Sequence, residues 1–231
     1  MMVAAEFVGK ERYSIEDLTE ILKVLRSPEG CPWDREQDHK SIRRDFLEEC
    51  YEAIEAIDSA DPVLLREELG DVLLQLVFHS TIEEEEGRFT FYDVVSDVAE
   101  KMVVRHPHVF ADTKAETTEE VLTNWDQIKR ETKKQKSDRE VLRSITPAMP
   151  ALMRAQKVRK KAAKMGAKAG STEEIKARIA ENILSANEEN AFDTLGNALF
   201  DITELARHLG ADAEQALYET CRSYIEQFGE D

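Results

Sequence analysis

The sequence has few of the residues that interrupt helices. Its 231 residues include only nine Gly and six Pro, and aromatic residues make up 7%. Together with 34% charged residues and few β-branched runs, this composition argues against a sheet protein and predicts an all-α fold. The length allows one large domain or two small ones, and either could bury a core.

Cysteine and long apolar runs are also scarce. Cys31, Cys50 and Cys221 are odd in number and widely spaced, so we expect neither a disulfide framework nor a zinc site. No run of 18 apolar residues occurs, and the N-terminus contains acids and lacks a long apolar core. We therefore expect no membrane span and no signal peptide, and predict a cytoplasmic protein.

Positive charge is outnumbered, which makes stable nucleic-acid binding unexpected. The formal net charge is −17, yet residues 129–168 hold 14 Lys and Arg against three Asp and Glu, a local net of +11. This basic segment could meet phosphates or an acidic neighbour, and a solvated helix pair with a connector explains it about as well. No G-x-x-x-x-G-K-[ST] motif occurs, which argues against a P-loop ATPase.

The stretch 48–71 carries more carboxylates than a helical hairpin needs for solubility. Two groups have helical spacing: Glu48, Glu49 and Glu52 in the first, and Glu68 and Asp71 in the second. Asp61 and Pro62 between them suit an N-cap and a first-turn proline, so the second group begins a new helix that can run back along the first. The two acidic stripes would then face each other.

The apolar residues of the two helices predict which faces are buried. The expected faces are Ile42, Phe46, Cys50, Ala53, Ile54 and Ile57 on the first helix, and Leu65, Leu69, Val72, Leu73 and Leu76 on the second. Glu68, Asp71 and Gln75 would lie along one flank of the second face, and Gly70 suggests a close helix approach. Converging carboxylates imply a cation or raised pKa values, and all-oxygen ligands favour Mg²⁺, with Mn²⁺ as an alternative. The plainer interpretation is a solvated acidic face.

The pattern E-E-x-x-E followed by E-x-x-D resembles the MazG family of nucleoside triphosphate pyrophosphohydrolases. The resemblance is close over residues 14–165 and faint afterwards. It includes GCPWDREQDH at 30–39, REELGDVLLQLVFH at 66–79, RHPHVF at 105–110, NWDQIK at 124–129 and PALMRAQKVRKKAA at 150–163.

The resemblance implies a fold, an activity and roles for named residues. The fold is an all-α helical bundle of the MazG-like (all-α NTP pyrophosphatase) type, and the activity converts nucleoside triphosphates to monophosphates and pyrophosphate, with removal of noncanonical nucleotides as one role. The implied metal ligands are Glu49, Glu52, Glu68 and Asp71, with Glu48 orienting them or taking a proton from the attacking water. The implied nucleotide contacts are Trp33, Lys101, Arg105, Asn124, Trp125 and Lys129. For the two tryptophans the residue type by itself favours packing over nucleotide contact.

Three segments are expected along the chain: a catalytic domain at 1–135, a basic linker and connecting helix at 136–170, and a degenerate second repeat at 171–231. In the repeat, LGN at 195–197 stands opposite LGD at 69–71, with Asp193 and Asn197 in place of the acidic ligands and Arg178 nearby. A structural repeat that helps to form a homodimer or a higher homo-oligomer is the prediction. A non-catalytic nucleotide or metal sensor and a purely structural scaffold remain alternatives.

Overall fold

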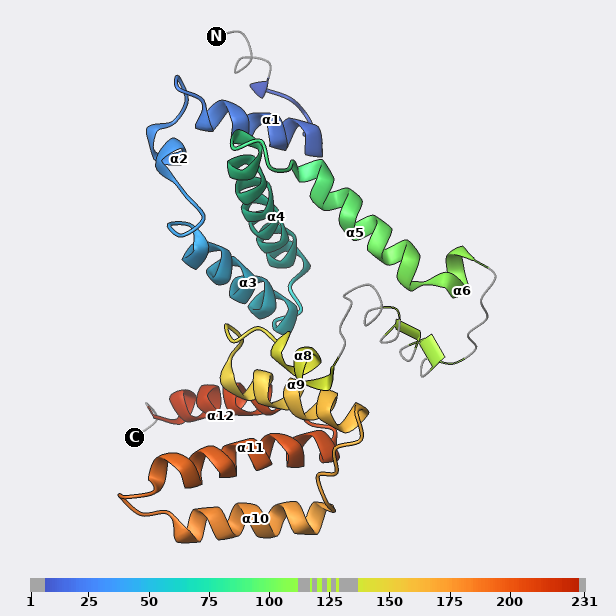
Figure 1. Cartoon of the computed structure of the whole chain (residues 1–231). Coiled ribbons are helices and arrows are strands. Elements are labelled where there is room, and N and C mark those ends of the chain that lie inside the picture. The colour runs from blue at the N-terminus through green and yellow to red at the C-terminus, as the bar shows by residue number, and fades with distance from the viewer. Residues whose placement is uncertain are drawn as a thin grey trace. The chain divides into compact units, whose positions relative to one another are not determined.

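The computed structural model describes residues 7–111, 117, 120, 121, 124, 125, 128 and 137–228, and this part of the chain contains helices and no strand (Figure 1). The helices are α1 (Ile15–Arg26), α2 (Pro32–Glu36), α3 (Arg43–Asp58), α4 (Pro62–Glu85), α5 (Phe91–Arg105), α6 (Pro107–Phe110), α8 (Asp138–Arg143), α9 (Ala151–Lys164), α10 (Thr172–Ser185), α11 (Ala191–Leu209) and α12 (Ala213–Gln227). The predicted all-α fold is confirmed. Contacts divide the chain into a first unit, residues 1–121, and a second unit, residues 122–231.

Short polar motifs set the starts of the helices in the first unit. Ser14 and Asp17 form a capping box at α1, and Thr90 and Asp93 form another at α5. Each box satisfies backbone N–H groups that have no partner within the helix. These caps fix where the chain turns, and α4 then packs against α1, α3 and α5.

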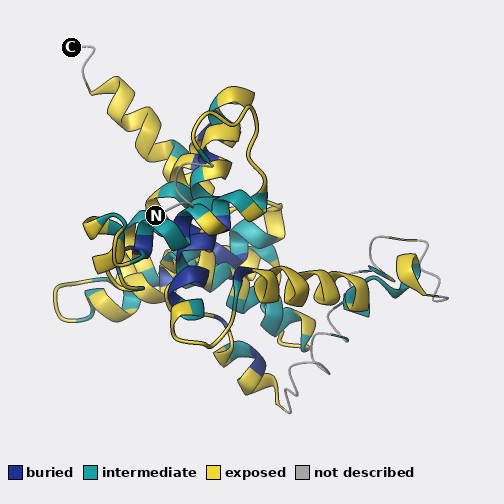
Figure 2. Cartoon of the chain, turned by 90° about the horizontal axis from the view of Figure 1, so that it is seen from above, coloured by how far each residue is buried: buried dark blue, intermediate teal, exposed yellow. Residues whose placement is uncertain are grey.

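The core of the first unit lies at the C-terminal half of α4. Its buried residues are Leu22, Ile42, Val77, Phe78, Ile82 and Phe91, and Ile15, Leu18, Ile21, Leu73 and Leu74 pack against them. The N-terminal half of α4, which carries the acids, lies outside this cluster. Most helices bury only a narrow face, as the yellow exposed turns in Figure 2 show.

The predicted buried face of α3 is wrong at its C-terminal end, where Ile54 and Ile57 are 47% and 59% exposed.

The predicted buried face of α4 is also wrong in part. Leu69 and Leu76 are 53% and 40% exposed, whereas Glu68 and Gln75 are each 8% exposed. Apolar residues occur around the whole of α4, so their spacing alone could not tell which stripe packs on α3. The close approach expected at Gly70 is also wrong, because a Cβ there would meet no atom of the described residues within 4 Å.

The second unit contains a second helical hairpin, α10 and α11, against which α9 packs. Ser171 and Glu174 form the capping box of α10, and Gly210 ends α11 in the left-handed conformation. The region 136–170, expected to be a linker and connecting helix, holds α8 and α9, and α9 packs on both α11 and α12. The three segment boundaries remain predictions. None of the described helices is long and apolar enough to cross a membrane.

Candidate active site

The hairpin of α3 and α4 is built by a three-residue turn. Ala60 in this turn has a φ of 54°, in the left-handed region. The Asp61 carboxylate then accepts hydrogen bonds from the backbone N–H groups of Val63 (2.8 Å) and Leu64 (3.2 Å), which caps α4, and Pro62 occupies its first turn. The second acidic group therefore runs back along the first, as the sequence predicts.

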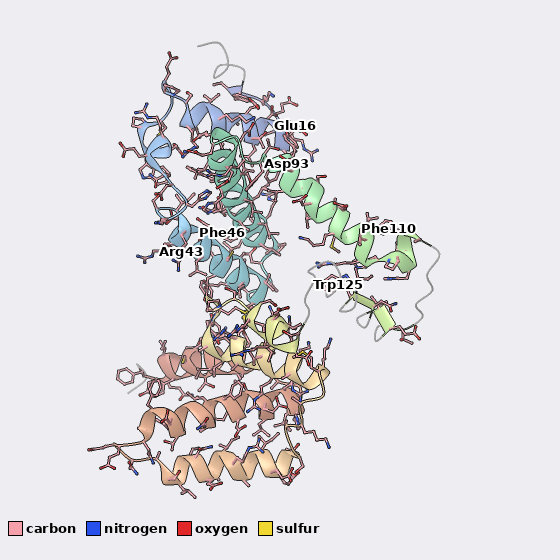
Figure 3. The ribbon with its side chains drawn as sticks, in the orientation of Figure 1. Glu16, Arg43, Phe46, Asp93, Phe110 and Trp125 are labelled. Atoms are coloured by element: carbon pink, nitrogen blue, oxygen red, sulfur yellow. The ribbon has the colours of Figure 1, made fainter. Side chains whose placement is uncertain are left out.

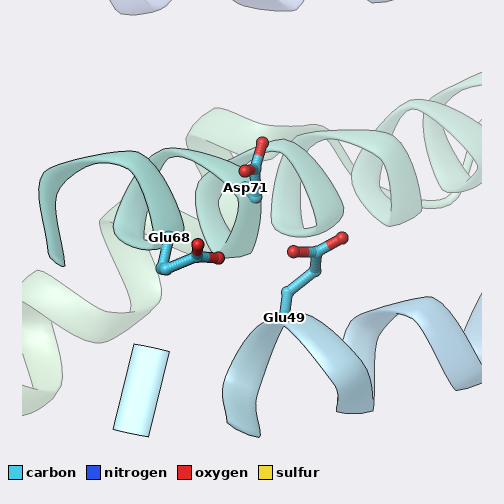
Figure 4. Close-up of side chains that lie close together, drawn as sticks. All are labelled: Glu49, Glu68 and Asp71. Atoms are coloured by element: carbon cyan, nitrogen blue, oxygen red, sulfur yellow. The ribbon is translucent and has the colours of Figure 1, made fainter. Parts of the chain in front are cut away.

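The hairpin brings three carboxylates together. Glu49 on α3 and Glu68 and Asp71 on α4 each offer an oxygen, and these oxygens lie within 4.8 Å of one another. Figure 4 shows Glu49 reaching from its helix toward the one that carries the other two. We call these three residues the acidic cluster.

Burial and mutual repulsion both act on the acidic cluster. Burial is the largest cause of the raised pKa of Glu68, followed by the charges of Glu52 and Asp71. Burial also raises the pKa of Glu49, and the charge of Asp71 is the next cause. The Glu68 Oε2 atom is buried and has no hydrogen-bond partner in the described residues. A group of carboxylates with a buried, unbonded oxygen fits a divalent cation, which would supply the missing positive charge.

The other two predicted acids lie at the edge of the acidic cluster. Glu48 and Glu52 are exposed on α3 and do not belong to the group of oxygens within 4.8 Å. Their charges nevertheless reach it, because both raise the pKa of Glu49 and Glu52 also raises that of Glu68. The structure thus places them beside the site, and their roles remain predictions.

The predicted nucleotide contacts lie on other elements. Trp33 is 58% exposed on α2, and Lys101 and Arg105 lie in the C-terminal half of α5. Asn124 and Trp125 are helical and half-buried, and they belong to the second unit (Figure 3 labels Trp125). Lys129 lies outside the described residues. The structure therefore brings the three carboxylates of the acidic cluster together, and the nucleotide contacts remain predictions.

A buried arginine anchors the loop that carries Trp33. The Arg26 guanidinium donates two hydrogen bonds to the Glu85 carboxylate, at 2.7 and 2.8 Å. It also donates to the backbone carbonyl oxygens of Asp34 (2.6 Å) and Gln37 (3.1 Å). One side chain of α1 thereby ties the loop around α2 to the end of α4. Arg26 was not predicted, since nothing in its spacing distinguishes it from a surface charge.

Two histidines join the same loop to α4. The Nδ1 atoms of His39 and His79 lie 2.8 Å apart, and their rings stack with centroids 5.0 Å apart. His39 Nε2 lies 2.5 Å from the Glu83 carboxylate, which also accepts from Arg88. The hydrogen bonds from Arg88 and His39 lower the pKa of Glu83 to about 2, while burial lowers the pKa of His79. The lowered pKa favours the neutral form of the His79 ring within this network.

The second hairpin replaces the acidic cluster with ion pairs. The Asp201 carboxylate on α11 is buried and accepts hydrogen bonds from Arg159 (2.7 Å) and Arg178 (3.1 Å). Asp193 and Asn197, expected to stand for the ligands, are both exposed. With LGN opposite LGD, the place of Glu68 falls on Thr194, so the expected correspondence of Asp193 is wrong by one residue. Among the described residues, the one group of acids suited to a metal lies in the first unit.

Comparisons with known proteins identify the relatives of this chain. The profile of the MazG nucleotide pyrophosphohydrolase domain matches residues 37–110, which include both acidic groups. The nucleoside triphosphate pyrophosphohydrolase/pyrophosphatase MazG of Thermotoga maritima is 40% identical over 218 residues, covering 92% of this chain and 83% of that protein. The nucleoside triphosphate pyrophosphohydrolase of Escherichia coli K12 is 40% identical over 226 residues, covering 94% and 86%. That of Mycobacterium tuberculosis is 38% identical over 178 residues, covering 76% and 52%.

Proposed function

The chain belongs to the MazG family of nucleoside triphosphate pyrophosphohydrolases, which makes it a hydrolase of nucleoside triphosphates, and we propose that the acidic cluster is its active site. The observation that carries this proposal is the convergence of Glu49, Glu68 and Asp71 from two helices, with one carboxylate oxygen buried and unbonded. Such a group is unfavourable without a cation, so its presence needs a functional reason.

The proposed reaction is the attack of water on the α-phosphorus. A bond forms between the water oxygen and the α-phosphorus, and the bond from that phosphorus to the oxygen bridging to the β-phosphorus breaks. Pyrophosphate leaves with the bonding electron pair, and the nucleoside monophosphate remains. Glu48 takes the proton of the attacking water or orients the ligands, because it is exposed on the same helix as Glu49 and close enough for its charge to raise the pKa of Glu49. No side-chain nucleophile is needed.

The MazG family is metal-dependent, and among the described residues the acidic cluster is where carboxylates gather for a metal ion. We propose Mg²⁺, with Mn²⁺ as the alternative, because all the available ligands are hard oxygens. Glu49, Glu68 and Asp71 would hold it, with Glu52 as a further ligand from the edge. When bound, such an ion neutralises the triphosphate and lowers the pKa of water.

Contacts to the nucleotide are proposed at Trp33, Lys101, Arg105, Asn124, Trp125 and Lys129. Three of these residues lie in the first unit. Arg26 and the histidine pair hold the loop carrying Trp33 on α4. The cations of α5, Lys101 and Arg105, are four residues apart and so share one side of the helix, where they could meet a triphosphate. Canonical and noncanonical nucleotides are both included in the proposed substrate range.

Self-association as a dimer or higher homo-oligomer is supported by apolar surface on the hairpin. Leu47, Tyr51 and Ile54 form an exposed stripe along α3, and Leu69 and Leu76 lie exposed on α4. This surface adjoins the acidic cluster, because the same two helices carry both. A second copy of this chain is the occupant that we propose. The cytoplasmic location remains a prediction.

Pyrophosphate release from a panel of canonical and noncanonical nucleoside triphosphates, with and without magnesium, tests the proposal. We expect magnesium-dependent release that Glu68→Gln abolishes. Glu55→Gln is the matched control, since Glu55 is exposed on α3 and does not belong to the acidic cluster. Nucleotide binding without release would support a sensor instead, and the absence of both binding and metal dependence would support a scaffold.

A further inference from the structure

Gln75 is a buried polar residue whose amide oxygen has no partner among the described residues. It is 8% exposed on α4, and its Oε1 atom is buried without a hydrogen-bond partner in the described residues. The buried hydroxyl groups further along α4 are satisfied within the helix: the Thr81 hydroxyl donates to the carbonyl oxygen of Val77 at 2.9 Å. An unbonded buried amide costs stability, so its retention calls for a ligand.

The pairing of α3 and α4 places Gln75 next to the acidic cluster. Asp71 lies beside Glu49, and two turns further along α4 the His79 ring contacts Phe46 at 5.7 Å between centroids (Figure 3 labels Phe46). Gln75 lies midway between Asp71 and His79 on the same stripe of the helix. It therefore faces α3 between Phe46 and Glu49.

In the second hairpin, the two positions that correspond to Glu49 and Gln75 are joined by a hydrogen bond. Taking LGN opposite LGD, Asp201 stands at the place of Gln75, and taking Glu181 opposite Glu52, Arg178 stands at the place of Glu49. The Asp201 carboxylate and the Arg178 guanidinium are directly hydrogen-bonded at 3.1 Å. At these positions the second hairpin has an ion pair, whereas the first has a carboxylate and an amide whose oxygen is unbonded among the described residues.

We propose that Gln75 is a positioning residue for the acidic cluster, with its amide holding a water molecule that completes the shell of the bound cation. The inference rests on the proposed function. An amide suits this place because it can hydrogen-bond to water without adding a further negative charge to carboxylates that already repel one another. Acting through such a water, Gln75 would affect cation affinity and turnover without touching the nucleotide.

The test compares Gln75→Met, similar in volume and apolar, with Thr81→Val, which removes a buried hydroxyl that is satisfied within α4. Three quantities are measured: the melting temperature without metal, the Kd for Mn²⁺ by titration of its free electron-spin signal, and kcat and KM for pyrophosphate release. For Gln75→Met we expect an unchanged or higher metal-free melting temperature, a Kd raised about tenfold or more, and a kcat lowered by a similar factor at nearly constant KM. Thr81→Val should leave Kd and kcat within about twofold of wild type.

A Kd and a kcat within about twofold of wild type in Gln75→Met would overturn the inference while leaving the proposed function intact. A fall in the metal-free melting temperature together with lost binding would show a packing role and also overturn it. If Gln75→Met does not fold, Gln75→Ala replaces it, and the same Kd and kcat criteria apply. Failure of the wild-type protein to bind Mn²⁺ and to release pyrophosphate would refute the proposed function itself.

Discussion

Removing one charge from the acidic cluster should have opposite effects with and without metal. In metal-free protein at neutral pH, we expect Glu68→Gln to raise the melting temperature, because the native state then holds one fewer of the mutually repelling carboxylates. In magnesium we expect the order to invert, because wild type gains binding energy that the variant largely loses. Glu55→Gln should behave as wild type in both conditions.

The size of both effects follows from the geometry. Two carboxylates 4.8 Å apart repel by about 3 kcal/mol at an effective dielectric constant of 20, and water reduces this for the half-buried Glu49 and Asp71. Magnesium at a hundredfold excess over Kd adds about 2.7 kcal/mol to the stability of wild type. For a chain of this length that amounts to an increase in Tm of roughly 5–11 °C.

The pH dependence gives an independent measure of the same charges. Glu49 and Glu68 have raised pKa values in the folded state, so they stabilise metal-free protein at low pH and lose this contribution as pH rises through those values. Glu83 acts in the opposite sense, because its pKa is lowered to about 2 in the folded state. Ionised Glu83 therefore stabilises the fold above pH 4.5, and this stabilisation is lost as pH falls toward 2. Above pH 4.5, therefore, the advantage of Glu68→Gln should grow with pH.

Thermal denaturation of metal-stripped protein from pH 4.5 to 8, repeated with magnesium, measures both effects. Equal melting temperatures for wild type and Glu68→Gln across that range, with no response to magnesium or manganese, would refute the argument that these carboxylates form a cation site.

Three further outcomes are expected. Glu52→Gln should fold normally and release pyrophosphate at no more than a tenth of the wild-type rate, a loss of about 1.4 kcal/mol or more in transition-state stabilisation. A smaller loss of activity would show that Glu52 is not a metal ligand. Asp201→Asn should destabilise the protein by about 2–3 kcal/mol, because it leaves Arg178 without its buried partner, whereas Asp193→Asn at an exposed position should change stability little. The kcat for pyrophosphate release should be unchanged in both variants. A large loss of kcat in well-folded protein would mean that the second hairpin serves an active site. Gly70→Ala should stabilise α4 by up to about 1 kcal/mol in chemical denaturation, since a Cβ there meets no atom within 4 Å, and destabilisation would indicate a contact made by a partner.

Local signals in the sequence were enough to predict much of the hairpin. The Asp61 cap and the three-residue step from Glu68 to Asp71 act within a few residues, where geometry is set by helix periodicity and capping. The convergence of the two acidic groups followed from these alone. The family resemblance then supplied the activity, which composition and spacing could not.

Only the tertiary structure decided which side of α4 is buried. Its apolar residues surround the helix, so the sequence pattern favoured a face containing Leu69 and Leu76, whereas packing on α3 buried Glu68 and Gln75. The bonds of Arg26 to the loop around α2 and the contact between His39 and His79 likewise join residues far apart in the chain. The pairing of Asp201 on α11 with Arg178 on α10 is a further contact between two helices. Periodicity fixes what lies along one helix, but the choice of facing residues depends on how two helices pack, and that is a property of the assembled fold.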